Sequence, residues 1–218
     1  MNWENKLNLL FIITSDLNAI HSQKIIHRDL HSGNILQDNL HSAYIVDLGL
    51  SIQYLKQDRQ IYGVLPYVDP KVLMGSQYTL ASDVYSFGMI MWEILYGKSV
   101  SYNCDLSDNN FQIKVCYENL RPLVNDEAPR CYVDLMKRCW DQDPENRPTA
   151  QELCDIFREW QYDEKILSEL NEYKVILENV GNSYIDIYGG ASKIIPQTNS
   201  ISISDSGLLD LDLLDLEI

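Results

Sequence analysis

The chain has 218 residues, 45% of them hydrophobic and 22% charged, which is enough apolar material for one substantial core. Its formal net charge of −15, from 17 basic and 32 acidic residues, repels nucleic acid and anionic lipid, so we expect neither class of partner. The five cysteines form no CxxC or other metal-ligand spacing, which indicates reduced, mostly buried thiols. With no basic leader and no apolar run long enough to cross a bilayer, we expect a cytoplasmic or nuclear protein without membrane contact.

The first predicted element is an amphipathic helix over about residues 5–22, where apolar residues recur at helical spacing. Two short β-rich runs follow at 34–36 and 43–46. They flank Asp38-Asn39, a turn-forming pair, and therefore predict a small hairpin.

Residues 47–80 hold scattered glycines and prolines without a sustained period, which predicts a long structured loop of the kind that carries function. From residue 81 to 95 the sequence predicts an almost entirely apolar helix in the middle of a core, ended by Gly97 as its C-cap. Further helices are predicted near 108–118, 130–140 and 149–160. The last of these begins at Thr149, with Glu152 placed to complete a capping box.

These elements divide the chain into three parts. Residues 1–160 form the predicted domain, and residues 161–180 are expected to add a charged helical extension. Residues 181–218 mix Gly, Ser and Asn with an Asp/Leu alternation that offers no packing face, so we expect a disordered acidic tail.

The segment H-R-D-L-H-S-G-N at residues 27–34 resembles the catalytic loop H-R-D-L-x-x-x-N of protein kinases, and Asp47-Leu48-Gly49 is similar to their magnesium-binding D-F-G. Phosphoryl transfer needs a base to orient the hydroxyl and oxygen ligands to hold magnesium on the phosphates. The resemblance implies that Asp29 is the base and that Asn34 and Asp47 are the metal ligands. It also implies ATP and Mg²⁺ as cofactors.

Two neighbouring positions complete the site that the resemblance implies. Leu36 would form the floor under the adenine. His31 stands where serine/threonine kinases often have a lysine that touches the γ-phosphate. The resemblance implies the same catalytic role for His31, with weaker support for the phosphate charge because a histidine is mostly neutral at pH 7 and shorter than a lysine.

The rest of the family pattern follows in order. Residues 63–71 resemble the end of an activation segment, and residues 82–88 resemble the start of the buried central helix, whose Asp83 would cap the backbone of the catalytic loop. Cys139-Trp140, Asp143-Pro144 and Arg147-Pro148 match the closing signature. The resemblance covers about residues 2–160 and is nearest to the tyrosine-kinase-like group, which mostly phosphorylates Ser and Thr. It implies a mainly α fold: a kinase-like C-terminal lobe with a small β-hairpin and an activation loop.

Some features depart from the family. Only 26 residues precede His27, so the N-terminal β lobe with its Gly-rich loop is missing from this sequence, and we expect the chain alone to bind ATP poorly and to be inactive. The face toward that lobe is expected to be an exposed apolar patch. Val64 stands where many serine/threonine kinases have a threonine that bonds the catalytic aspartate.

Lys71 replaces the glutamate that pairs with an arginine matched here by Arg147. Two like charges would then face each other at a partly buried site. Relief would come from Lys71 turning to solvent, from a depressed lysine pKa, or from Asp69 or Asp143 stepping in.

Two functions remain open. The first is phosphoryl transfer from Mg-ATP to Ser/Thr of a protein substrate, by a truncated kinase domain. The alternative is a non-catalytic, pseudokinase-like module that binds a scaffold partner. Of the histidines outside the site, His21 and His41 are expected to be solvated without partners, and His27 to be a packing residue rather than a proton carrier.

Overall fold

The protein is described by a computed structural model over residues 1–39, 42–53, 60–100, 110–173 and 184–185. Its helices are α1 Trp3–Ser22, α2 Pro70–Leu73, α3 Leu80–Tyr96, α4 Phe111–Tyr117, α5 Arg130–Cys139, α6 Ala150–Trp160 and α7 Glu164–Glu172. Its strands are β1 Ile25–Ile26, β2 Ile35–Asn39, β3 Ser42–Ile45, β4 Ile52–Gln53, β5 Arg121–Pro122 and β6 Tyr184–Ile185. The mainly helical fold with a small hairpin is confirmed.

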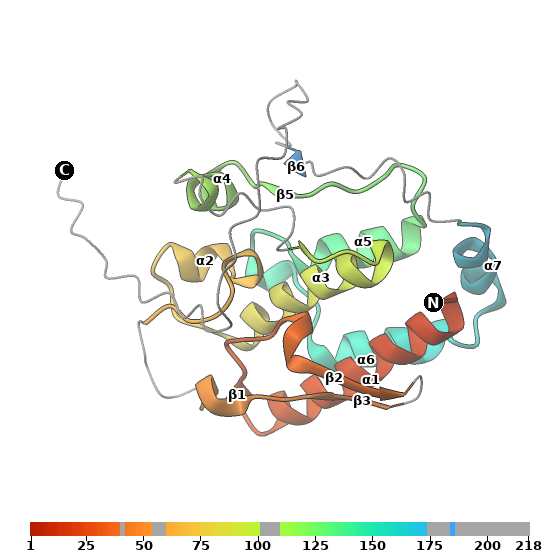
Figure 1. The fold of residues 1–218 in the computed structure, drawn as a ribbon, viewed down its shortest axis with the longest axis horizontal. Coiled ribbons are helices and arrows are strands. Elements are labelled where there is room, and N and C mark those ends of the chain that lie inside the picture. Colours follow the sequence, from red (N-terminus) through yellow and green to blue (C-terminus); the bar gives the residue numbers. More distant parts are fainter. Residues whose placement is uncertain (40–41, 54–59, 101–109, 174–183, 186–218) are drawn as a thin grey trace.

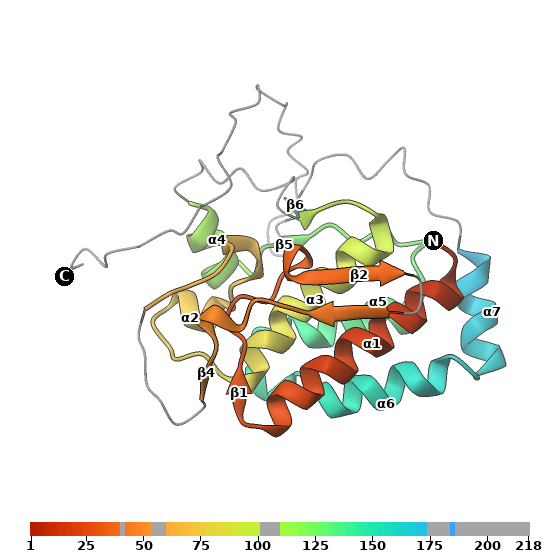
Figure 2. The ribbon, with the colours of Figure 1, turned by 60° about the horizontal axis from the view of Figure 1, so that its bottom comes forward.

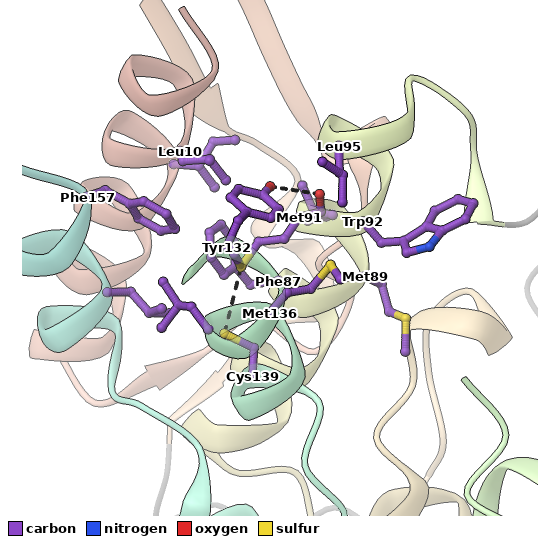
Figure 3. Close-up of a cluster of buried hydrophobic side chains, with 14 of the residues drawn as sticks. Leu10, Phe87, Met89, Met91, Trp92, Leu95, Tyr132, Met136, Cys139 and Phe157 are labelled. Atoms are coloured by element: carbon purple, nitrogen blue, oxygen red, sulfur yellow. Dashed lines mark hydrogen bonds between the residues drawn. The ribbon is translucent and has the colours of Figure 1, made fainter. Parts of the chain in front are cut away.

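The core lies between α3 and the helices around it. Helices α1 and α6 run side by side, and α3 packs against α5 next to them (Figure 1). Figure 3 shows Leu10 of α1, Met91 of α3, Tyr132 of α5 and Phe157 of α6 converging in this core. Almost every α3 side chain is buried, which is why its sequence is apolar all round. The predicted C-cap Gly97 ends α3 in the left-handed conformation, with φ 65°.

Strands β2 and β3 form an antiparallel hairpin that lies over α1 (Figure 2). Its first strand is longer than predicted: Asp38 and Asn39, expected in the turn, belong to β2, where a register shift between Gln37 and Asn39 accommodates them. The pair Leu36 and Tyr44 stands on the outer face and is 57% and 54% exposed. The hairpin thus presents apolar side chains to solvent.

The segment predicted as a long loop contains short elements of its own. Strand β4 pairs antiparallel with β1, which directly precedes the catalytic-loop segment. Helix α2 packs against α4, where the Gln112 amide donates to Leu73 O at 3.1 Å. A second, smaller apolar cluster joins these pieces. Each apolar run in this segment is only two or three residues long. A run of that length shows no periodicity from which a helix or strand could be predicted.

The C-terminal helices follow the sequence closely. Thr149 and Glu152 form the predicted capping box at the start of α6. Helix α7 covers one end of α1 and α5 through Leu170, which is fully buried (Figure 1). Glu169 of α7 accepts a hydrogen bond from the Cys131 amide at 3.1 Å, so it serves the first turn of α5, which has no side-chain cap of its own.

Other predictions fall partly outside the described residues. The helix near 108–118 is seen from Phe111 onward, and the helical extension is seen as α7. Of the predicted disordered tail the structure describes only β6, which pairs with β5; the remainder lies outside the described residues. The four cysteines in the described part, Cys116, Cys131, Cys139 and Cys154, are free and three of them are buried. No helix in this part is long and apolar enough to cross a membrane.

Candidate active site

The backbone of the segment 27–34 is held by hydrogen bonds to Asp83 of α3. The Asp83 carboxylate, 1% exposed, accepts hydrogen bonds from the His27 amide at 2.8 Å and the Arg28 amide at 3.0 Å. This is the backbone capping that the resemblance implied. A third contact was missed: His21 Nε2 lies 2.9 Å from Asp83 Oδ2. The expectation of a solvated His21 without a partner is wrong, because the last turn of α1 lies beside the first turn of α3 and leaves the His21 side chain 8% exposed.

His27 is fully buried and bonded at both ring nitrogens. Nε2 lies 3.1 Å from Val46 O, and Nδ1 accepts from the Asp29 amide at 3.3 Å. A carbonyl at Nε2 and an amide donor at Nδ1 together favour a neutral ring with its proton on Nε2. His27 therefore packs and orients the loop, as expected from the sequence, and has no free position for proton transfer.

Asp29 lies at the centre of the site. The Asn34 amide donates to Asp29 O at 2.8 Å and to its carboxylate at 3.3 Å. The other carboxylate oxygen, Oδ1, is buried and has no hydrogen-bond partner in the described residues; His31 Nε2 lies 3.6 Å away. Burial raises the pKa of Asp29, while His31 and the Asn34 hydrogen bond oppose that rise. One oxygen is thus oriented by Asn34, and the other is buried without a hydrogen-bond partner among the described residues.

Asp47 reaches the same site from the opposite side. The Val46 amide donates to Asn34 O at 2.9 Å, so the residue that follows it, Asp47, is tied to the catalytic-loop segment. Asp47 adopts the left-handed conformation, with φ 61°, and its carboxylate accepts from the Gly49 amide at 3.2 Å. Its charge is the smallest of the contributions to the pKa of Asp29, which it raises.

The remaining predicted site residues lie around this centre. Leu36 is on the outer face of the hairpin and Leu48, 47% exposed, follows Asp47. The His31 side chain is 20% exposed and its Nδ1 accepts from the Gly33 amide at 3.1 Å. Its ring lies 5.8 Å from that of Tyr67, between centroids. The structure therefore brings Asp29, His31, Asn34 and Asp47 together, with Leu36 on the adjoining hairpin.

A metal at this site would have few protein ligands. Among the described residues, no group of three or more His, Cys, Asp and Glu side chains could hold a metal ion. The Asn34 amide and the Asp47 carboxylate supply two oxygens, which suits a cation that keeps most of its coordination for phosphates and water. This donor set fits Mg²⁺ bound together with a nucleotide.

The expected contact between Lys71 and Arg147 is wrong. Arg147 forms a two-pronged, buried ion pair with Asp69, with Nη2 at 3.1 Å from Oδ1 and Nη1 bonded to Oδ2. The two side chains are 0% and 1% exposed. Asp69, one of the acids considered as a substitute, thus takes the place of the family glutamate from two positions earlier in the chain, and Lys71 is left partly exposed.

Sequence reasoning missed Glu93, a second buried carboxylate near the site. Its Oε1 accepts from the Tyr67 hydroxyl at 2.6 Å and from the Val100 amide at 2.7 Å. Burial, together with Glu93, raises the pKa of Tyr67. The available signal was an acid in the otherwise apolar second half of helix α3. Glu93 joins the 63–71 segment to the end of that helix.

Comparisons with known proteins identify the family of the chain. A family model described as protein tyrosine and serine/threonine kinase matches residues 1–157. Over 156 residues the chain is 32% identical to a probable LIM domain-containing serine/threonine-protein kinase of Dictyostelium discoideum, covering 70% of this chain and 23% of that protein. It is 30% identical over 154 residues to a probable serine/threonine-protein kinase of that organism, covering 69% and 36%. A dual specificity protein kinase of that organism is 34% identical over 148 residues, covering 65% and 19%. The chain thus spans only about a fifth to a third of these relatives.

Proposed function

The chain belongs to the protein tyrosine and serine/threonine kinase family, and on this premise we propose that it supplies the substrate-facing part of a kinase domain. The proposed reaction is transfer of the γ-phosphoryl group of Mg-ATP to a serine or threonine hydroxyl of a protein. One observation supports it above all: Asn34 is bonded to Asp29 on one side and to the strand leading into Asp47 on the other. Three residue types that this chemistry requires therefore meet at one place.

Asp29 is proposed as the base. The Asn34 amide holds one carboxylate oxygen in place, and the other, Oδ1, has no hydrogen-bond partner among the described residues, so the carboxylate keeps the capacity to accept the substrate hydroxyl. Asp83 fixes the loop backbone, so the direction in which Asp29 points is set by the core helix α3. Positioning of this kind supplies much of the rate in phosphoryl transfer.

Asn34 and Asp47 are proposed as the magnesium ligands. Mg²⁺, when bound there with the nucleotide, would neutralise charge on the phosphates. Leu36 would lie beneath the adenine, and His31 would face the γ-phosphate. The exposed outer face of the hairpin is consistent with a nucleotide or a further part of the protein covering it.

The Asp69–Arg147 pair removes one argument for the alternative function. Lys71 in place of the family glutamate suggested a degenerate, non-catalytic copy, but the buried ion pair is retained by Asp69. The intact Asp29, Asn34 and Asp47 therefore favour chemistry over a purely binding role.

The test is a phosphoryl-transfer assay on the polypeptide expressed from the complete transcript. We expect Mg²⁺-dependent transfer from ATP to a protein substrate, lost in Asp29→Asn and retained in Asp143→Asn, a matched change at an exposed acid. We expect the 218 residues alone to show no measurable transfer, because they contain no Gly-rich loop to cover the phosphates. Transfer that survives Asp29→Asn would contradict the assignment of the base. No transfer from the complete polypeptide would leave the binding module as the function.

A further inference from the structure

The hydroxyl of Tyr78 bonds both backbone groups of one distant residue. It accepts a hydrogen bond from the Tyr62 amide at 2.9 Å and donates one to the Tyr62 carbonyl. Tyr78 is 8% exposed and immediately precedes Thr79, the N-cap of α3. A single phenol therefore anchors the chain at Tyr62 to the base of the core helix.

The ring of Tyr62 in turn lies against the catalytic loop. The Arg28 guanidinium carbon is 4.5 Å from the centroid of the Tyr62 ring and 5.9 Å from that of Tyr78. Arg28 Nε also donates to Leu50 O. A guanidinium stacked on two aromatic faces is held by cation–π attraction as well as by hydrogen bonds.

The next residue, Gly63, touches the base itself. A Cβ on Gly63 would lie 3.1 Å from Arg28 O and 3.3 Å from Asp29 Oδ1, and its φ of 99° is one that other residues rarely adopt. The backbone at Tyr62–Gly63 therefore packs directly on Arg28–Asp29, next to the unpaired carboxylate oxygen.

We infer that Tyr78 is a positioning residue for Asp29: its hydroxyl fixes the Tyr62 backbone, and the Tyr62–Gly63 segment then holds Arg28 and Asp29 in place. The inference rests on the proposed role of Asp29, but the contacts on which it depends exist without catalysis. Burial raises the pKa of Tyr78 to about 12, so its hydroxyl remains protonated and able to donate near neutral pH.

The experiment compares Tyr78→Phe with Tyr62→Phe in this chain, by amide hydrogen exchange and by backbone NMR. Each substitution removes one phenolic oxygen. The Tyr62 hydroxyl donates to Gln60, whereas the Tyr62 ring contacts Arg28 and the Tyr62 backbone bonds to Tyr78. Tyr62→Phe therefore leaves the proposed contacts in place and serves as the control. In Tyr78→Phe the Tyr62 amide should exchange on the order of thirtyfold faster, since each of two lost hydrogen bonds contributes roughly a factor of five. The Asp29 amide signal should move as well. In Tyr62→Phe the exchange rate of the Tyr62 amide and the position of the Asp29 signal should remain near their original values. The amides of α3 should stay protected in the two variants.

Two results would overturn the inference. If exchange at Tyr62 rises but the Asp29 signal does not move, Tyr78 has a local structural role only. If neither changes more than in Tyr62→Phe, the anchor does not hold the segment. If Tyr78→Phe loses protection throughout α3, Tyr62→Leu is the second variant. It removes the ring from Arg28 and keeps both backbone bonds, and an unmoved Arg28 amide signal there would refute the link between Tyr62 and the loop. None of these readouts requires phosphoryl transfer, so a failure of the proposed function would be seen separately.

Discussion

Replacing Asp69 with asparagine should destabilise the fold strongly, because it leaves the Arg147 charge buried without its counter-ion. Asp69 and Arg147 are 1% and 0% exposed, and two charge-assisted hydrogen bonds join them. Apart from this pair, Arg147 donates to the carbonyls of Ala81 and Asp141, each at 2.9 Å, and neither carries a charge. Breaking a buried pair by removing one partner costs about 3 to 5 kcal/mol. The isosteric asparagine side chain retains one acceptor oxygen, so we expect the lower end, about 3 kcal/mol.

The assay is urea denaturation of Asp69→Asn, Arg147→Met and the double variant. The coupling energy between the two sites should be at least about 2 kcal/mol, because each single variant leaves the remaining charged side chain buried without its partner. Asp143→Asn is the matched control: it makes the same change at an exposed acid, and it should alter the free energy of unfolding by no more than about 1 kcal/mol. Equal effects of Asp69→Asn and Asp143→Asn, or a coupling energy near zero, would refute the ion pair.

The same pair reverses an expectation for Lys71→Glu. If Lys71 faced Arg147, this change would add about 1 to 3 kcal/mol of stability. Since Arg147 is already paired with Asp69 and Lys71 is partly exposed, we now expect a change of no more than about 0.5 kcal/mol.

Two further substitutions test the appended helix and the site. Leu170→Ala should lower the free energy of unfolding in urea by about 2 to 5 kcal/mol, because Leu170 is fully buried. The control is Leu167→Ala at a half-buried position of the same helix, which should lower it less. Equal losses would mean that α7 does not dock as described. Asp29→Asn should stabilise the chain at pH 7 by a few tenths to about 1 kcal/mol and have little effect near pH 3. Burial raises the folded-state pKa of Asp29, so the stability it contributes is present below its unfolded pKa and lost as pH rises through the folded one. Melting temperatures at the two pH values check this, and destabilisation at pH 7 would contradict it.

Local features were predictable from the sequence because their cause lies within a few residues. Thr149 and Glu152 are three apart and form their capping box, and Gly97 ends α3. The order and spacing of Asp29, Asn34 and Asp47 likewise follow from one loop and one hairpin. These residues remain candidate site residues whose roles await the assays above.

Contacts between distant segments were not predictable in this way. Asp69 and Arg147 are 78 positions apart, and His21 and Asp83 are 62 apart, so no local period links them. Asp69 could be weighed as a substitute partner, but only the folded structure, in which its carboxylate meets the Arg147 guanidinium, selects it over Asp143. The hairpin turn was misplaced for a similar reason: Asp38 is turn-forming by type, yet pairing with β3 extends the strand past it.

The carboxylate of Asp83 also determines how the catalytic loop moves. It joins α1, the loop and α3 through three donors: the His21 ring and the amides of His27 and Arg28. Opening the loop would remove hydrogen-bond donors from a charged group that is 1% exposed on the buried helix α3, and stranding a buried charge costs about 3 to 5 kcal/mol. Residues 27–29 have no regular secondary structure, yet these contacts lead us to expect that their amides are protected from hydrogen exchange together with those of α3.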